Sequence, residues 1–212
     1  MTQTIETRNR LRGEQLVDAL RKRNFDACYV KTKEDALRKA LEWIPEGSSV
    51  GWGGSSSIAE IGLQEAIRRG NYIAVDRDNA RNPEEREQIM HEVLGVDFFL
   101  TSANAISEDG TMVNIDGHAN RLAAMCYGPR HVLYIIGMNK VVASPEDAYR
   151  RARHEAAPIN AMRFDLNTPC SATGCCYDCQ SPDTICCQIL ITRHSQIPGR
   201  GMVILVEEPL GF

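Results

Sequence analysis

Apolar residues recur along this chain with two periods, one typical of amphipathic helices and one typical of short buried strands. The helical period predicts five helices, over about residues 1–20, 32–44, 57–69, 82–94 and 144–161. Short apolar runs predict strands at residues 25–30, 48–52, 72–75, 96–101, 111–115 and 131–136, and a last pair at 188–192 and 202–207. Because helices and strands alternate, we expect an α/β fold: an open, mostly parallel sheet with helices on both faces.

Two of the predicted helices begin with sequences typical of helix N-termini. Thr32 stands three residues before Asp35, which is the spacing of a capping box. Asn82 is followed by Pro83 and two acidic residues, so that a capping side chain precedes a proline at the first helical position. The two helices should therefore begin directly after Thr32 and Asn82.

The chain changes in character at Thr168-Pro169. Cysteine, glycine and polar residues dominate over 168–188, and this stretch is too short to bury a core of its own. A length of 212 residues suits one sizeable core. We therefore expect a single domain over 1–212, with residues 168–188 as a cysteine-rich excursion within it.

Charge and hydropathy exclude several classes of partner. The net charge is −4 and the chain has no Lys/Arg block, so nothing favours nucleic-acid binding. The longest apolar runs are far shorter than the about 20 residues that a membrane span requires. The polar start of the chain has no apolar segment typical of a secretory signal. We therefore expect a cytoplasmic protein without a membrane span, and a homo-oligomer is compatible with these features.

A Gly/Ser turn after the second predicted strand is the first candidate binding site. Its residues are Gly53, Gly54, Ser55 and Ser56. Glycines let the backbone approach a ligand closely, serines add donors, and open α/β sheets bind ligands beyond the carboxyl ends of their strands. The turn lacks the spacing of a dinucleotide fingerprint and of a P-loop. A tight turn without any ligand remains the alternative.

Polar and small residues are also unusually dense between 101 and 121. Glu108 and Asp116 are candidate catalytic acids, bases or nucleophiles. Arg121 is a candidate partner for a substrate carboxylate. Further candidate ligand-binding residues in this stretch are Asn104, Thr111 and Asn120. The alternative is structural, because Glu108-Asp109-Gly110 is a good turn sequence and Asn120 a good helix cap.

Six of the eight cysteines fall between Cys170 and Cys187. Thiolates select zinc, copper(I) or iron–sulfur clusters. In a four-thiolate site, Cys176 and Cys179 would form the chelating pair, and Cys170 and Cys186 would close it. One tight pair with loosely spaced flanking ligands favours a [4Fe-4S] cluster over zinc. A redox-active disulfide is a third alternative.

Four cysteines lie outside the proposed ligand set. Cys175 and Cys187 adjoin proposed ligands, and either could take the place of its neighbour. Outside the cluster, Cys28 and Cys126 stand among apolar residues, and we expect both thiols to be buried.

Short motifs over nearly the whole chain resemble one known family. They are Gly53-Gly54-Ser55, Thr101-x-x-Asn104-Ala105-Ile106, Glu108-x-Gly110-Thr111, Asn120-Arg121-Leu122-Ala123-Ala124, Gly128-Pro129, Ala157-Pro158-Ile159-Asn160-Ala161 and Leu210-Gly211-Phe212. They resemble the lactate-utilisation (LUD) domain family, and most of all its small stand-alone branch with a cysteine-rich tail. The pattern of that tail, Cys-x5-Cys-x2-Cys-x6-Cys, selects Cys170, Cys176, Cys179 and Cys186.

The resemblance implies a fold like that of the sugar-phosphate isomerases and CoA transferases. It also implies a part in oxidation of L-lactate to pyruvate, beside iron–sulfur oxidoreductase subunits. Our first hypothesis is thus a redox protein of 2-hydroxy-acid utilisation that binds a small anionic ligand and carries a [4Fe-4S] cluster. One alternative is a CoA or acyl transferase that uses Glu108 as nucleophile. Another is a non-enzymatic assembly subunit with structural zinc.

Overall fold

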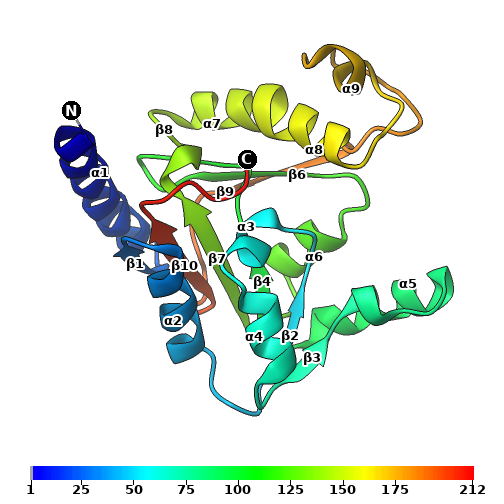
Figure 1. The fold of residues 1–212 in the computed structure, drawn as a ribbon, viewed down its shortest axis with the longest axis horizontal. Helices are drawn as coiled ribbons and strands as arrows, with labels where there is room; N and C mark the ends of the chain where they lie inside the picture. Colours follow the sequence, from blue (N-terminus) through cyan, green and yellow to red (C-terminus); the bar gives the residue numbers. More distant parts are fainter. Residues whose placement is uncertain (1) are drawn as a thin grey trace.

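A six-stranded sheet in which all neighbours run parallel forms the centre of the molecule. The computed structural model describes residues 2–212, with the side chains of residues 4–212. The sheet order is β1 (Asp26–Val30), β10 (Gly201–Val206), β7 (His131–Gly137), β4 (Phe98–Thr101), β2 (Ser49–Trp52) and β3 (Ile73–Val75). Figure 1 shows these strands side by side with helices around them. The predicted α/β fold is confirmed.

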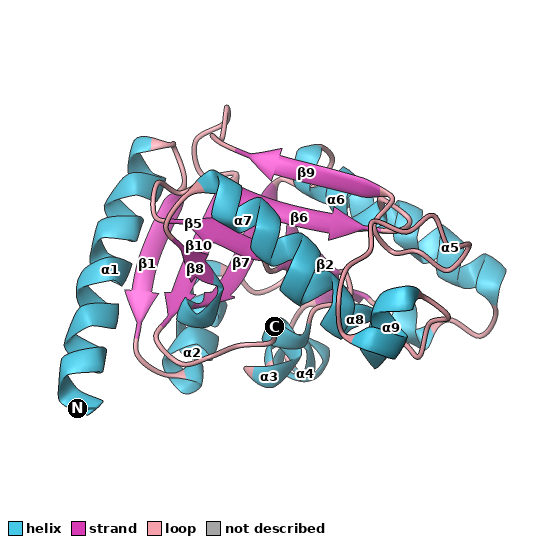
Figure 2. Ribbon diagram, turned by 90° about the horizontal axis from the view of Figure 1, so that it is seen from above, coloured by secondary structure: helices cyan, strands magenta, loops and turns pink. Residues whose placement is uncertain are grey.

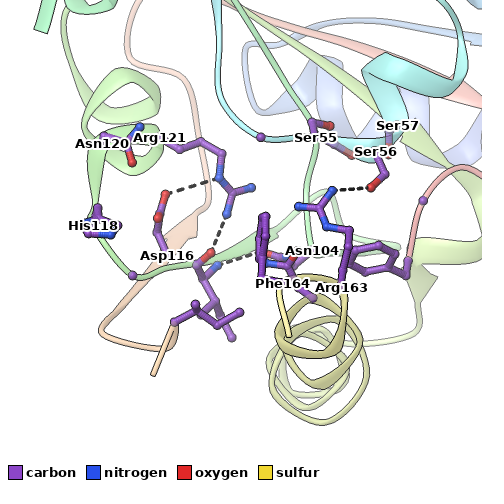
Figure 3. Close-up of a pocket in the computed structure, with 18 of the residues that line it drawn as sticks. Ser55, Ser56, Ser57, Asn104, Asp116, His118, Asn120, Arg121, Arg163 and Phe164 are labelled. Carbon is purple, nitrogen blue, oxygen red and sulfur yellow. Dashed lines mark hydrogen bonds and ion pairs between the residues drawn. The ribbon is translucent and has the colours of Figure 1, made fainter. Parts of the chain in front are cut away.

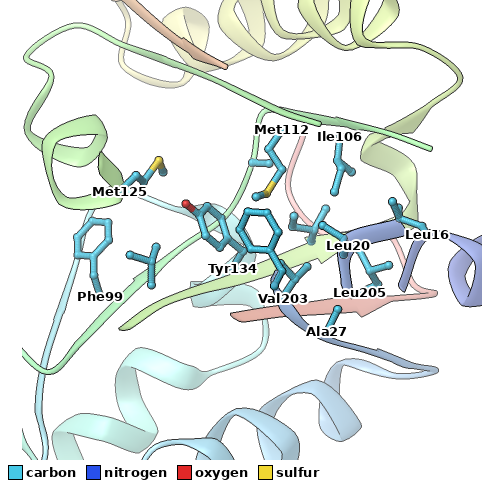
Figure 4. Packing of buried hydrophobic residues seen from close by; sticks show 14 of the residues in the cluster. Leu16, Leu20, Ala27, Phe99, Ile106, Met112, Met125, Tyr134, Val203 and Leu205 are labelled. Carbon is cyan, nitrogen blue, oxygen red and sulfur yellow. The ribbon is translucent and has the colours of Figure 1, made fainter. Parts of the chain in front are cut away.

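Both faces of this sheet are buried, because successive side chains of a strand point to opposite sides. Along β7, Val132 and Tyr134 pack into one core, and Leu133 and Ile135 pack into another. The first core holds the residues drawn in Figure 4. A parallel sheet covered on both sides explains why its strands read as nearly continuous apolar runs.

Helices cover each face. On one face lie α2 (Lys33–Trp43), α3 (Ser56–Glu60) and α4 (Leu63–Arg69). On the other lie α1 (Thr2–Lys22) and α6 (Asn120–Cys126). The helix α5 (Pro83–Glu92) follows β3, and short 3-10 turns occupy Arg77–Asn79, Val93–Gly95 and Met138–Lys140. No helix of the described chain is long and apolar enough to cross a membrane.

A second, smaller sheet lies over the face that carries α1 and α6. Its order is β8 (Val141–Val142), β5 (Ala105–Ser107), β6 (Met112–Asp116) and β9 (Gln188–Thr192). Ile106 and Met112 point from it into the first core. Its outer side is covered by α7 (Pro145–Arg151), a π-helical turn (Ala152–Ala156) and α8 (Ala157–Arg163), which Figure 2 shows crossing above β6.

The last two strands, β9 and β10, belong to different sheets, although we expected them to form a pair. The strand β9 pairs antiparallel with β6, whereas β10 enters the centre of the parallel sheet between β1 and β7. Burial explains this difference. All six residues of β10 are buried, whereas β9 is an edge strand with a largely exposed surface.

The predicted helix starts are confirmed. The Thr32 hydroxyl accepts a hydrogen bond from the backbone N–H of Asp35 at 3.1 Å. The Asn82 side chain accepts one from Glu85 at 2.8 Å. Each cap satisfies an N–H group that the first turn of a helix leaves without a partner.

The cysteine-rich excursion connects α8 to β9. It contains the short helix α9 (Pro169–Thr173) and otherwise no regular structure up to β9. Figure 1 shows it at one end of the α7–α8 layer. That residues 168–188 belong to one domain spanning 1–212 stays a prediction.

A substitution at Gly128 tests how closely the loop before β7 packs against Leu94 in the turn after α5. The φ of Gly128 is +110°, and an added Cβ would collide with the backbone carbonyl of Leu94. Gly128→Ala is expected to lower the free energy of unfolding by about 2–4 kcal/mol in urea titrations, because neither backbone can yield easily. Gly95→Ala is the matched control, since its Cβ would meet nothing within 4 Å. Equal stability of the two variants would contradict this packing.

Candidate functional site

A cavity of about 470 Å³ opens where the central strands of the parallel sheet end. Ser55 and Ser56 follow β2, Ser102 and Asn104 follow β4, and Lys140 follows β7. Because β2, β4 and β7 are neighbours and run parallel, their carboxyl ends meet at one edge of the sheet. This is the place where open α/β sheets bind ligands.

The Gly/Ser turn allows arginine side chains to approach the backbone closely. A Cβ on Gly53 would lie 3.1 Å from the side chain of Arg121, and one on Gly54 would lie 2.9 Å from Nη2 of Arg77. The Ser56 hydroxyl accepts a hydrogen bond from Nη1 of Arg163 at 3.0 Å. The glycines thus make room for guanidinium groups.

Positive charge dominates the lining of the cavity. Four guanidinium groups and one ammonium group line it: Arg77, Arg86, Arg121, Arg163 and Lys140. Among the described residues, Asp116 supplies the only side-chain carboxylate of the lining, and Asp78 lies behind the lining, paired with Arg77 and Arg86. Asp116 accepts a hydrogen bond from Nε of Arg121 at 3.4 Å. The cavity therefore carries a clear excess of positive charge.

Two arginines face each other across this space. Figure 3 shows Arg121 reaching in from α6 and Arg163 reaching in from α8. Burial lowers the pKa of Arg163, and the charge of Arg121 lowers it further. The Arg163 guanidinium stacks over Phe164 at 4.4 Å and lies 5.7 Å from the ring of Phe212. An anion between the two guanidinium groups would offset their repulsion.

Lys140 lies at the inner wall of the cavity. Its side chain is almost completely buried, and Nζ donates hydrogen bonds to the hydroxyls of Ser57 at 2.9 Å and Ser102 at 3.1 Å. Burial lowers its pKa to about 7, and the charges of Arg151 and Arg121 add to this effect. No carboxylate of the described chain lies within 4 Å of Nζ.

Most of the residues predicted from the sequence come together here. The cavity is lined by Gly54, Ser55, Ser56, Asn104, Asp116, Asn120 and Arg121, and Gly53 lies directly behind Arg121. Glu108 and Thr111 lie elsewhere. Glu108 accepts a hydrogen bond from Nε of Arg12 at 2.7 Å, and Thr111 donates to Asp109.

Sequence reasoning missed Arg77, Arg163 and Lys140. Lys140 could have been found by the rule that selected the Gly/Ser turn, because it closely follows a buried strand. Arg77 also follows a strand, β3. No local signal points to Arg163, which comes from the end of α8 and reaches the cavity only through the tertiary fold.

A second, smaller cavity of about 50 Å³ lies beside the cysteine-rich excursion. Its lining includes the four predicted thiols, Cys170, Cys176, Cys179 and Cys186. The neighbouring Cys175 and Cys187 are exposed and do not line it. The fold thus separates the four cysteines of the expected pattern from the two additional ones.

An arginine adjoins these thiols. Nη2 of Arg153 lies 3.6 Å from Sγ of Cys176. Arg153 belongs to the π-helical turn, where the N–H of Ala157 donates to the carbonyl of Ala152, five residues back. The wider turn ends two residues before Pro158, which has no N–H to continue the hydrogen-bond pattern of a regular helix.

The thiols surround a space without converging on one point. Among the described residues, no three His, Cys, Asp or Glu side chains are close enough together to hold a single metal ion. Burial raises the pKa of Cys186 to about 11, Arg153 lowers it, and the three other thiols raise it.

The two cavities share a wall. Ile185 lines both of them. Helix α8 also borders both, with Ala157 and Ala161 on the cysteine side and Asn160 and Arg163 on the cationic side. The excursion therefore helps to shape the cationic cavity.

Comparison with known proteins agrees with this architecture. The sequence model of the LUD domain matches residues 13–206. The chain belongs to the LUD domain family. Among solved structures, it is similar to a DUF162 family protein from Deinococcus radiodurans, with 14% sequence identity and a TM-score of 0.52. That similarity covers 94% of this chain and 98% of the other, so the LUD-family fold extends over nearly the whole sequence.

Two further comparisons add little. A partial similarity to eIF2B delta from Chaetomium thermophilum has 15% identity and a TM-score of 0.37, and it covers 57% of this chain and 54% of that one. No curated protein matches the sequence.

The cysteines outside the cluster give a direct test of the structure. Cys126 is exposed, so the prediction that it is buried was wrong, because it lies at the solvent-facing end of α6. Cys28 is only partly buried, so its predicted full burial is not confirmed, although desolvation raises its pKa to about 11. At pH 8, iodoacetamide should modify Cys126 first and Cys28 much later, as followed by peptide mass spectrometry. Since thiolate increases about tenfold per pH unit below the pKa, modification of Cys28 should still accelerate up to pH 10. Rapid modification of Cys28 at pH 8 would contradict its partial burial.

Proposed function

We propose that this LUD-family protein takes part in lactate-type (2-hydroxy-acid) utilisation by binding a small carboxylate in the cationic cavity beside a four-cysteine iron–sulfur site. One observation carries the proposal: a cavity rich in guanidinium groups shares a wall with a pocket of four thiols. Membership of the LUD domain family supports the link to lactate.

The cavity suits a carboxylate because guanidinium groups bind carboxylates through two parallel hydrogen bonds. Arg121 already shares its charge with Asp116. Arg163 has no carboxylate partner within 4 Å in the described part of the chain and bonds only to a serine hydroxyl. We therefore assign the ligand carboxylate to Arg163, with Arg121 on the opposite side. The rings of Phe164 and Phe212 lie beside the Arg163 guanidinium and would contact the apolar part of the ligand.

The four thiols suit a [4Fe-4S] cluster, which takes one cysteine per iron from a set of four. Cys170, Cys176, Cys179 and Cys186 would hold it. Such a cluster would supply single-electron transfer. Arg153, which also pairs with Asp178, would offset part of the negative charge that four thiolates bring to the site. Its distance from Cys176 fits a weak hydrogen bond to a sulfur ligand.

The shared wall supports a common purpose for the two sites. A reaction at a ligand between Arg121 and Arg163 would be separated from the cysteine pocket by Ile185 and α8. Iron–sulfur subunits that accept electrons are the partners that this arrangement would serve. The transferase alternative gains no support from the position of Glu108, which pairs with Arg12 outside the cavity.

Arg163 tests the assignment of the ligand carboxylate. Arg163→Gln is expected to weaken binding of L-lactate and pyruvate about 10- to 100-fold in isothermal titration calorimetry, because a charge-assisted pair is lost. Arg69→Gln is the matched control, because Arg69 is 80% exposed and pairs with Glu65 on the surface of α4. Unchanged affinity of the Arg163 variant would remove the assignment, and no binding by the wild type would remove the proposed ligand class.

Cysteine variants test which of the six clustered thiols bind the iron–sulfur cluster. After anaerobic purification, the wild type should contain about four irons per chain with broad visible absorbance. Cys176→Ser should lose most of the iron and sulfide, whereas Cys175→Ser should retain both, because Cys175 points away from the pocket. Loss of iron in the Cys175 variant alone would overturn the ligand set. A colourless protein with about one zinc would favour the structural-zinc alternative.

A further inference from the structure

Lys140 is buried but has no carboxylate partner, and the binding of a ligand carboxylate by Arg121 and Arg163 does not require it. Only 4% of the residue is exposed, yet it lines the cationic cavity. Buried lysines are rare unless they are paired with a carboxylate. In the described chain, the partners of Nζ are two serine hydroxyls. A group of this kind at the wall of a ligand cavity is a candidate for chemistry.

The bonding of Nζ leaves one position of the nitrogen available. Two N–H groups donate to Ser57 and Ser102, at 2.9 and 3.1 Å. The hydroxyl of Ser57 in turn donates to the carbonyl of Leu210, and that of Ser102 to the carbonyl of Ala103. Both serines therefore act as acceptors toward Nζ. A neutral amine in this setting satisfies both N–H groups and keeps its lone pair free.

The surrounding charges favour that neutral amine. Arg151 and Arg121 both disfavour a further positive charge at Nζ. Glu60 is the acid that acts in the opposite direction, but its carboxylate accepts bonds from Lys33 at 3.2 Å and from the backbone N–H of Gly211 at 3.0 Å. With a pKa of about 7, half of the amine is neutral near pH 7. An ordinary lysine would be neutral in only about one molecule in 3,000.

We propose that Lys140 is a nucleophilic lysine that forms an imine with a 2-oxo carboxylate bound in the cavity. This inference rests on the proposed function, since it requires that the cavity binds such a ligand. A desolvated amine next to cationic groups is the typical environment of an imine-forming lysine. The 2-oxo acid is the ligand class that combines an anionic group for the arginines with a carbonyl for the amine.

The step is balanced without any oxidant or reductant. Nζ attacks C2 of the ligand, the C–N bond forms, and the former ketone oxygen becomes a hydroxyl by taking a proton. Loss of that oxygen as water leaves a C=N bond, and the two hydrogens of the water derive from the two N–H groups of the amine. Ser57 and Ser102 accept hydrogen bonds from those N–H groups and are placed to pass the protons on.

Borohydride trapping tests the proposal on the full-length protein. Pyruvate is added, the mixture is quenched with sodium borohydride, and the adduct is located by intact-mass and peptide mass spectrometry. We expect one stable adduct, on Lys140. Propanoate, which lacks the ketone, should give none and should protect against pyruvate. Absence of an adduct, or labelling spread over exposed lysines such as Lys22, overturns the proposal.

Variants and pH give two independent readouts. Lys140→Arg keeps a long basic side chain but has no nucleophilic amine, so it should abolish the adduct, whereas Lys22→Arg should leave it unchanged. The initial rate of adduct formation should level off above about pH 7, the pKa of the buried amine. A rate that still rises up to about pH 10, as for an ordinary lysine, would overturn the proposal. The pH dependence is measured on the wild type, so it does not depend on whether the Lys140 variant folds.

Calorimetry without borohydride separates this inference from the proposed function. If pyruvate binds the wild type but no adduct can be trapped, Lys140 acts as a cation only, and the imine proposal fails while the anion site stands. If neither pyruvate nor L-lactate binds, and no adduct is trapped, the proposed ligand class fails and the imine fails with it.

Discussion

The parallel pairing of β2, β4 and β7 is the constraint on which the rest of this structure depends. Parallel strands end at the same edge of a sheet, so the loops after Trp52, Thr101 and Gly137, which are far apart in sequence, must meet there. That requirement brings the Gly/Ser turn, Ser102 and Lys140 to one cavity. It also requires apolar side chains on both faces of each strand, since a parallel sheet is stable only when covered on both sides. The two cores and the cationic cavity are therefore consequences of the same strand order.

The fold was largely predictable because its signals are local. Helix caps at Thr32 and Asn82 form through side chains that are three residues from the groups they satisfy. The short apolar runs correctly gave the six strands of the main sheet. The second sheet was not foreseen, because β5 and β8 have only three and two residues and their pairing depends on the neighbours that tertiary folding supplies. For the same reason, β9 and β10 were expected together although they belong to different sheets.

The candidate site was predictable in part, most clearly where its residues closely follow a strand of the main sheet. Residues that follow strands, such as Ser55 and Asn104, could be anticipated from the rule that ligands bind beyond strand ends. Glu108 also stands in a polar segment, but it follows a strand of the second sheet and points to Arg12 on α1. Composition alone cannot tell the two sheets apart. Arg163 was not anticipated because an arginine at a helix end is usually solvated, and only the position of α8 beside the cavity makes Arg163 part of the lining.

The concentration of positive charge around one cavity gives the strongest reason to connect this geometry with a ligand. Holding like charges close together costs stability unless opposite charges lie nearby, and Arg77, Arg121 and Arg163 line one cavity with Asp116 in its wall and Asp78 beside Arg77. An anion between them would remove part of that cost. Because Ile185 forms part of the wall, the conformation of the cysteine-rich excursion bears directly on the shape of the space that an anion would fill. A metal that orders the four thiols would thus also order one side of the ligand cavity.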